Sequence, residues 1–162
     1  MRLIIRNKLF SIGGGSIVQD EKNKDILKVR GKVFTITRKK FVCDLNGKKL
    51  YTVRNKFWRF FFASTLIYDE NKKKIAHIKQ RLSMKSTFVS NVNDLNIRIG
   101  IGESLLEKVI YFNEEKVATY YKSSLFIDSF ELQFDDDSLA PLLTAIIIAL
   151  DNIHDDNMDQ NQ

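Results

Sequence analysis

Pairs of basic residues recur at one spacing in the first half of the chain, and they are the side chains best suited to chemistry. A cation stands ten and twelve residues after each of Asp20, Asp44 and Asp69, at Arg30, Lys32, Arg54, Lys56, Lys79 and Arg81. Residues two apart on a strand share one face, so these six side chains, the basic ridge, are expected to point outward from three equivalent strands. Such a ridge could bind the phosphates of a membrane or of a nucleic acid; the alternative is a merely solvated face.

An aromatic segment follows the second pair of cations. Residues 57–62 read Phe-Trp-Arg-Phe-Phe-Phe, and alternation along a strand places the even-numbered rings on one face, which suits the interior of the protein. The other face carries Phe57, Arg59 and Phe61, a combination suited to shallow insertion among lipid head groups. Cover by a partner or a helix would explain Phe57 and Phe61 equally well. Lysine-rich turns at residues 38–40 and 72–74 would add about 1 kcal/mol per cation near an anionic membrane.

Catalytic chemistry has few candidates in this chain. Its only imidazoles are His77 and His154, and its only thiol is Cys43. No motif joins them to a serine, as a catalytic triad would require. His154 and the acidic residues after it could hold a metal only loosely, and a frayed tail explains them better. We therefore predict no catalytic residue, no metal site and no cofactor.

Each of the three aspartates begins a repeat that reads as strand, polar turn and strand. The repeats are DEKNKDILKVRGK, DLNGKKLYTVRNK and DENKKKIAHIKQR, and a shorter copy, NEEKVATYY, begins at Asn113. An aspartate at a turn entry accepts hydrogen bonds from the backbone beyond it, so these aspartates are expected to form turns rather than to catalyse. One aliphatic residue per repeat shares the outward parity of the cations, so a β-bulge or a partly covered edge is expected at Ile26, Leu50 and Ile75.

A single helix is expected near the end of the chain, over Leu139–Ile153. Apart from Thr144, this segment is apolar on every side until Asp151. A helix that is apolar all round must be buried all round. In one domain with about twelve short strands, the place that buries such a helix is the inside of a barrel.

This combination of hairpins and helix resembles the LURP-one-related family. The segments that carry the resemblance are GKVFTITRKKFVCDLNGKKLYTVRNKFW, IYDENKKKIAHIKQR and LAPLLTAIIIALDNI. The resemblance implies a mostly-β fold, a closed antiparallel barrel of about 12 strands around a central hydrophobic C-terminal helix, as in the Tubby C-terminal domain and the phospholipid scramblases. Tubby-like relatives bind phosphoinositide head groups, but none of their lipid-contact residues can be matched to a position here, and a shared fold does not by itself give a function.

The two halves of the chain differ strongly in charge. Residues 1–85 carry 22 Lys and Arg against 6 Asp and Glu, whereas residues 86–162 carry 4 against 14, so either one face is basic or the two halves neutralise each other. We expect a single domain over residues 1–154 and a disordered acidic tail over 155–162. No targeting segment is recognised, so the expected location is the cytoplasm, with peripheral contact at the inner membrane face.

The predicted function is non-enzymatic: binding of an anionic phospholipid surface, or membrane tethering, through the basic face. The alternative is a module that uses the same cations to bind an unidentified protein partner or, less favoured, nucleic acid. Nucleic-acid binding would show a steep salt dependence and would need no aromatic insertion.

Overall fold

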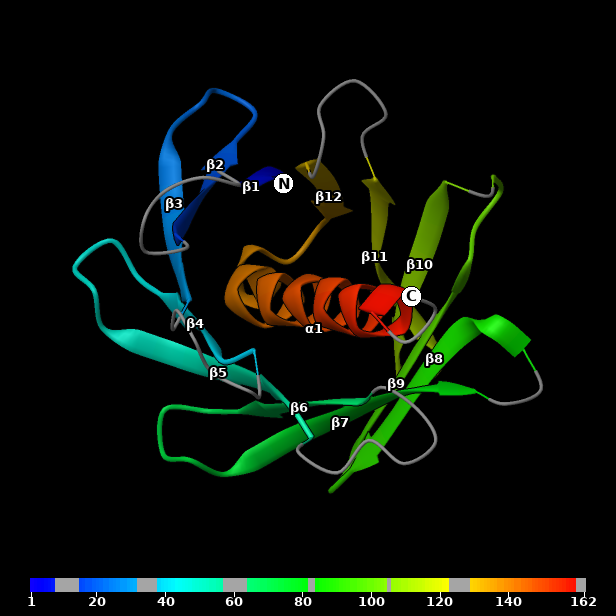
Figure 1. Ribbon diagram of the computed structural model, residues 1–162. Helices are drawn as coiled ribbons and strands as arrows, with labels where there is room; N and C mark the ends of the chain where they lie inside the picture. The colour runs from blue at the N-terminus through cyan, green and yellow to red at the C-terminus, as the bar shows by residue number, and fades with distance from the viewer. Residues whose placement is uncertain are drawn as a thin grey trace.

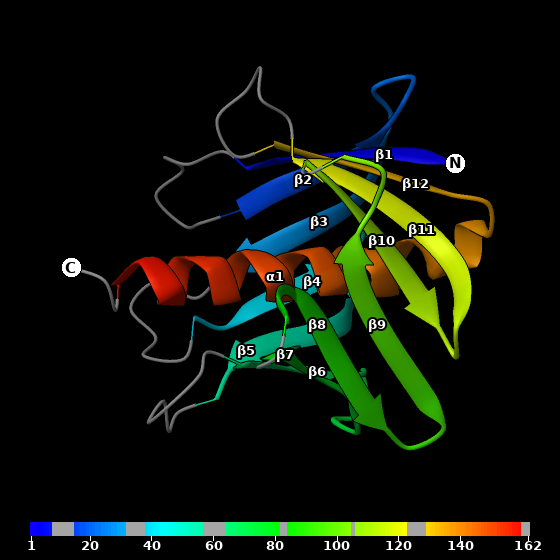
Figure 2. The ribbon, with the colours of Figure 1, turned by 90° about the vertical axis from the view of Figure 1, so that its right-hand side faces the viewer.

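The computed structural model describes residues 1–7, 15–31, 38–56, 64–81, 84–104, 106–122 and 129–159. Its elements are β1 (Arg2–Asn7), β2 (Gly15–Asp20), β3 (Asp25–Gly31), β4 (Lys40–Cys43), β5 (Lys49–Asn55), β6 (Ser64–Tyr68), β7 (Lys74–Arg81), β8 (Met84–Val92), β9 (Leu95–Ile101), β10 (Glu107–Phe112), β11 (Glu115–Lys122), β12 (Ser129–Phe134), the 3₁₀ helix η1 (Asp137–Leu139) and α1 (Ala140–Asp159). Each strand pairs antiparallel with the next, and β12 pairs with β1, so the sheet closes into a barrel (Figures 1 and 2). The predicted twelve-stranded closed barrel is confirmed.

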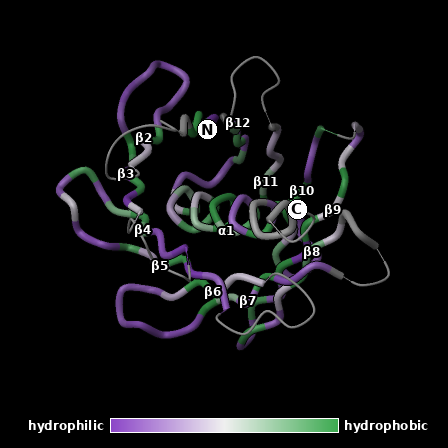
Figure 3. Tube along the Cα trace, viewed as in Figure 1, coloured by the Kyte–Doolittle hydropathy of each residue, from purple (hydrophilic) through white to green (hydrophobic). Residues whose placement is uncertain are grey.

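The aspartates of the repeat form turns at one end of this barrel. Asp44 Oδ1 accepts the backbone N–H of Lys48 at 2.8 Å, and Asp69 Oδ1 accepts that of Lys73 at 2.8 Å. Asp20 makes the equivalent bond at 2.9 Å. The three turns connect even-numbered to odd-numbered strands of an antiparallel barrel, so they lie at the same end, and Figure 3 shows them as hydrophilic. The prediction that these aspartates form turns is confirmed.

A β-bulge after each turn explains how aliphatic residues occupy outward positions. Near the start of β3, β5 and β7 the cross-strand pairing skips one residue, which is Ile26, Leu50 or Ile75. The shorter fourth copy skips Val117 in the same way, near the start of β11. All four side chains are half-buried and pack against the core. A bulge bends the strand and re-aims its side chains, so the predicted bulge is confirmed.

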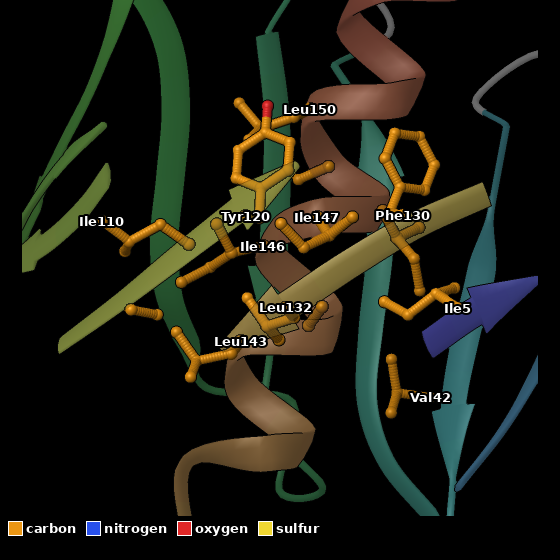
Figure 4. Close-up of a cluster of buried hydrophobic side chains, with 14 of the residues drawn as sticks. Ile5, Val42, Ile110, Tyr120, Phe130, Leu132, Leu143, Ile146, Ile147 and Leu150 are labelled. Atoms are coloured by element: carbon orange, nitrogen blue, oxygen red, sulfur yellow. The ribbon is translucent and has the colours of Figure 1, made fainter. Parts of the chain in front are cut away.

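Helix α1 lies inside the barrel, as the apolar pattern predicted. All residues from Leu143 to Leu150 are buried, and Ile147 is only 1% exposed. The helix packs most closely against β5 and β6. On its other side, Ile146 and Ile147 share one core cluster with Tyr120 of β11 and Leu132 of β12 (Figure 4). The barrel wall therefore buries the helix on all sides between Leu143 and Leu150.

The helix is longer than the sequence pattern indicates. It continues past Ile153 to Asp159 and so takes in residues 155–159, which the sequence analysis places in a disordered acidic tail. Asn152 is 0% exposed, and its Nδ2 donates to the carbonyl of Arg38 at 3.1 Å. The window Asp137–His154 is long and apolar enough to cross a bilayer by composition alone, but 61% of it is buried within the protein, as expected of a core helix.

Candidate anion-binding face

A shallow groove of about 270 Å³ lies on the outer face of β5 and β6, between the residue that precedes β4 and the β6–β7 turn. We call it the cationic groove. Its lining combines four cations, two carboxylates and two hydroxyl-bearing side chains: Lys39, Lys49, Arg54, Lys72, Asp69, Glu70, Thr52 and Tyr68. Because it mixes positive charge with hydrogen-bond donors, the groove is chemically suited to oxyanions.

Strand register and aromatic rings build this groove. Thr52 on β5 pairs with Phe41 on β4 and with Tyr68 on β6, so a ring stands on either side of Thr52. Lys49 Nζ lies 4.4 Å from the centroid of the Phe41 ring, and Arg54 Cζ lies 4.9 Å from that of Tyr68. Arg54 Nη2 also donates to the Tyr68 hydroxyl at 2.9 Å. These cation–π and hydrogen-bond contacts hold the cations in place before any ligand binds.

The carboxylates of the groove are engaged by neighbouring groups. Glu70 Oε2 lies 2.7 Å from Lys48 Nζ, and the hydrogen bond and charge of Glu70 raise the pKa of Lys48. Asp69 Oδ1 accepts the backbone N–H of Lys73 at 2.8 Å. Two carboxylates offset at most two of the four lining cations. The groove therefore keeps a positive charge that attracts anions.

The described residues of the basic ridge lie in different parts of the barrel surface. Arg54 lines the groove, whereas the guanidinium of Arg30 lies against the β4–β5 turn, where a methyl group on Gly47 would be 3.1 Å from its Nη2. Lys56 and Lys79 lie on neither of these sites. All four ridge side chains that the structure describes are exposed. The four described ridge cations thus lie in three neighbourhoods: the groove, the β4–β5 turn, and a third that holds Lys56 and Lys79.

Several residues predicted to bind a ligand fall outside the described part of the chain. They are Lys32, Phe57, Arg59, Phe61 and the side chain of Arg81. Membrane insertion of the aromatic pair therefore stays a prediction.

Lys56 and Lys79 lie on either side of Ser64. The backbone N–H of Lys56 donates to the Ser64 carbonyl at 3.0 Å, and Ser64 pairs with Lys79 across β6 and β7. Ser64 Oγ lies 3.2 Å from His77 Nε2. Burial, together with the charges of Lys56, Lys79 and Lys74, lowers the pKa of His77, so this imidazole is neutral at pH 7. We call Lys56, Ser64, His77 and Lys79 the Ser64 cluster.

The sequence predicted several of the cations of this face, but it did not predict the cationic groove. Lys39 and Lys72 belong to the lysine-rich stretches, but Lys49, Thr52 and Tyr68 were missed. The signal that could have found them is hairpin register. The Asp44 turn with a bulge at Leu50 sets Thr52 opposite Phe41.

The described residues carry no arrangement typical of a metal centre or an activated thiol. No three His, Cys, Asp or Glu side chains among them gather as metal ligands. Cys43 is buried, and burial raises the pKa of its thiol despite the nearby charges of Arg30 and Lys49. A protonated, buried thiol is a poor nucleophile.

Comparison with known proteins gives one result. The sequence model of the LURP-one-related family matches residues 1–151, which include all twelve strands and most of α1. No curated protein and no solved structure gives a significant match.

Proposed function

The chain belongs to the LURP-one-related family, and from this premise we propose that it is a non-enzymatic barrel that binds the anionic surface of a phospholipid membrane through the cationic groove. The observation that carries the proposal is the set of four cations around one groove, three of them held over aromatic rings. The proposal places the protein at the cytoplasmic face of a membrane, where anionic lipids attract basic surfaces.

Charge supports a surface contact of useful strength. Each cation held near an anionic membrane contributes about 1 kcal/mol. Lys49, Arg54 and Lys72 are all exposed, so together they would contribute about 3 kcal/mol at low salt, and the attraction would fall as salt shortens the Debye length.

Topology narrows the alternatives. The described strands close into a barrel in which each strand has a hydrogen-bonded neighbour on both sides, and this disfavours the addition of a strand by a protein partner. Single-stranded nucleic acid needs exposed aromatic faces for base stacking, but the Tyr68 ring in the groove and the Phe41 ring beside it lie beneath cations. Both features favour a contact made by outward-facing side chains with a charged surface.

Liposome co-sedimentation tests the proposal. The full chain would be mixed with neutral phosphatidylcholine vesicles and with vesicles containing phosphatidylserine, over a series of salt concentrations. We expect binding to the anionic vesicles alone, falling as salt rises. The variant Lys49→Gln, Arg54→Gln, Lys72→Gln should bind up to about a hundredfold more weakly, since about 1 kcal/mol is lost per cation.

A variant of equal charge change provides the control. Lys22→Gln, Lys24→Gln, Lys116→Gln removes three exposed cations from other parts of the barrel. If this control weakens binding as much as the groove variant, net charge rather than the groove is responsible. If wild type ignores anionic vesicles, the membrane proposal is wrong, and binding to RNA or to a protein partner becomes the question.

A further inference from the structure

We propose that the Ser64 cluster is a discrete binding site for a phosphate monoester group. This site is separate from the cationic groove, because none of its four residues lines that groove. It therefore does not rest on the membrane proposal, and it predicts binding of a small soluble anion in the absence of any lipid.

The strand register sets two ammonium groups beside one hydroxyl. Lys56, just after β5, lies opposite Ser64 of β6, and Ser64 pairs with Lys79 of β7, so Ser64 stands between the two lysines. Neighbouring strands are about 4.8 Å apart, so the two lysine Cα atoms stand about 10 Å apart. Flexible four-carbon stems let both ammonium groups meet above Ser64. Both lysines are exposed, and neither has an ion-pair partner within the described part of the chain.

His77 can set the direction of the serine hydroxyl. Its Nε2 lies 3.2 Å from Ser64 Oγ, and a neutral imidazole carries its proton on either nitrogen. When the proton is on Nε2, that N–H donates to Ser64 Oγ, and the hydroxyl hydrogen is available to an outside acceptor. An anion above Ser64 would select this tautomer. The cluster thus offers one oriented O–H donor between two cations.

This donor set matches a phosphate monoester better than other common anions. A phosphate monoester carries close to two negative charges at neutral pH and presents three strong acceptor oxygens. Two ammonium groups and one hydroxyl supply two positive charges and donors to separate oxygens. A phosphodiester carries one negative charge, so it would balance the charge of only one of the two lysines.

Nuclear magnetic resonance of the imidazole rings tests the site directly. The chain has only two histidines, so His77 is observed with the exposed His154 as an internal reference. Titration of the full chain with inorganic phosphate, and separately with glycerol phosphate, at pH 7.5 should shift the His77 ¹⁵N signals saturably and raise the Nε2–H tautomer. His154 should not follow the same curve.

Variants separate the site from diffuse charge. Lys56→Gln, Lys79→Gln should weaken the apparent phosphate affinity at least tenfold, and Ser64→Ala should weaken it several-fold, whereas Ser64→Thr should retain it. The matched control Lys22→Gln, Lys24→Gln should leave the affinity unchanged. Absence of a saturable His77 shift, or an equal loss in the control, would overturn the proposal.

A vesicle-binding experiment distinguishes a lipid head group from a soluble phosphate monoester as the ligand. Phosphatidic acid displays a monoester and phosphatidylglycerol a diester. Preferential binding of phosphatidic acid vesicles that Ser64→Ala abolishes would identify a lipid head group as the ligand. Equal binding to the two lipids, with phosphate titration intact, would identify a soluble monoester. The groove variant Lys49→Gln, Arg54→Gln, Lys72→Gln should leave the phosphate titration unchanged, so failure of either proposal is distinguishable from failure of the other.

Discussion

Each of the three repeat turns has one residue in the left-handed backbone region. The three residue types at this position differ in how readily they adopt that conformation. Asn23 has φ 61°, Gly47 has φ 88° and Lys72 has φ 64°. Glycine adopts this region freely and asparagine tolerates it, whereas lysine adopts it only at an energetic cost. The same turn geometry is therefore formed by three residue types, and the third turn is strained at a position that also supplies a groove cation.

Lys72→Gly should stabilise the protein. A left-handed lysine costs about 1–2 kcal/mol, and glycine loses about 0.5–1 kcal/mol more backbone entropy on folding. The expected gain is thus about 0.5–1 kcal/mol, measured by urea denaturation. Lys73→Gly, next to it and outside the left-handed region, should give no gain. Equal stability changes for the two variants would contradict the strain argument.

His77 should make the protein sensitive to mild acid. Its pKa is lowered in the folded state by burial and by neighbouring lysines, whereas in the unfolded state it takes the ordinary value of about 6.5. The unfolded chain then binds more protons just below pH 6.5, so stability falls as the pH drops from about 6.5 to the lowered pKa. Melting temperatures of wild type and His77→Gln, compared between pH 7.5 and 5 in phosphate-free buffer, should show the larger fall in wild type. Parallel curves would rule out this role.

At the scale of the elements, four bulges repeat at one place after a turn. Each lets an aliphatic residue that simple alternation would expose pack instead against the core. The bulge also shifts the register of everything beyond it, since a one-residue slip exchanges the two faces of a strand. The outward position of the cations in β3, β5 and β7 therefore depends on these bulges.

Ile75→Ser should show how much the bulge residue of β7 contributes to the free energy of unfolding. Burying a whole isoleucine side chain stabilises by about 1.5–3 kcal/mol, and Ile75 is half-buried, so we expect a loss of about 1 kcal/mol in the free energy of unfolding. Its exposed neighbour provides the comparison, because Lys74→Ser should change stability by no more than about 0.5 kcal/mol. A smaller loss at Ile75 than at Lys74 would mean that the bulge residue contributes nothing to the core.

The elements show what sequence patterns can and cannot predict. The turns at Asp20, Asp44 and Asp69 and the buried helix were predictable because they depend on local hydrogen bonds and on apolar periodicity. The end of α1 was not, because the apolar pattern stops at Ile153 whereas the helix continues through polar residues to Asp159. The groove was not, because it joins Lys39, just before β4, with Thr52 of β5 and Tyr68 of β6, and the register of these strands includes the bulge. Sequence spacing along one strand cannot supply that register.

At the scale of the whole molecule, the order of the strands determines where the basic half of the sequence lies in the barrel wall. Consecutive strands are neighbours, so β1–β7, from the basic half of the sequence, form one side of the wall, and β8–β12, from the acidic half, form the other (Figure 1). The halves therefore do not stack on each other face to face. A barrel that carries most of its lysines and arginines on one side would turn that basic side toward an anionic surface.

The central helix holds this wall together, and Ile147 is the residue that tests it. Its side chain is 1% exposed and belongs to the core cluster formed by the helix and strands from both charge halves. Ile147→Asp would bury a carboxylate without a partner, at a cost of several kcal/mol, while Leu106→Asp, at a position 60% exposed, should leave the melting temperature almost unchanged. If Ile147→Asp does not fold, Ile147→Ala gives a measurable loss of about 2–5 kcal/mol. A helix resting loosely on the outside of the sheet would tolerate both changes at Ile147, so an unchanged melting temperature in either variant would contradict the enclosed position of the helix and with it the closed barrel that orients the basic side.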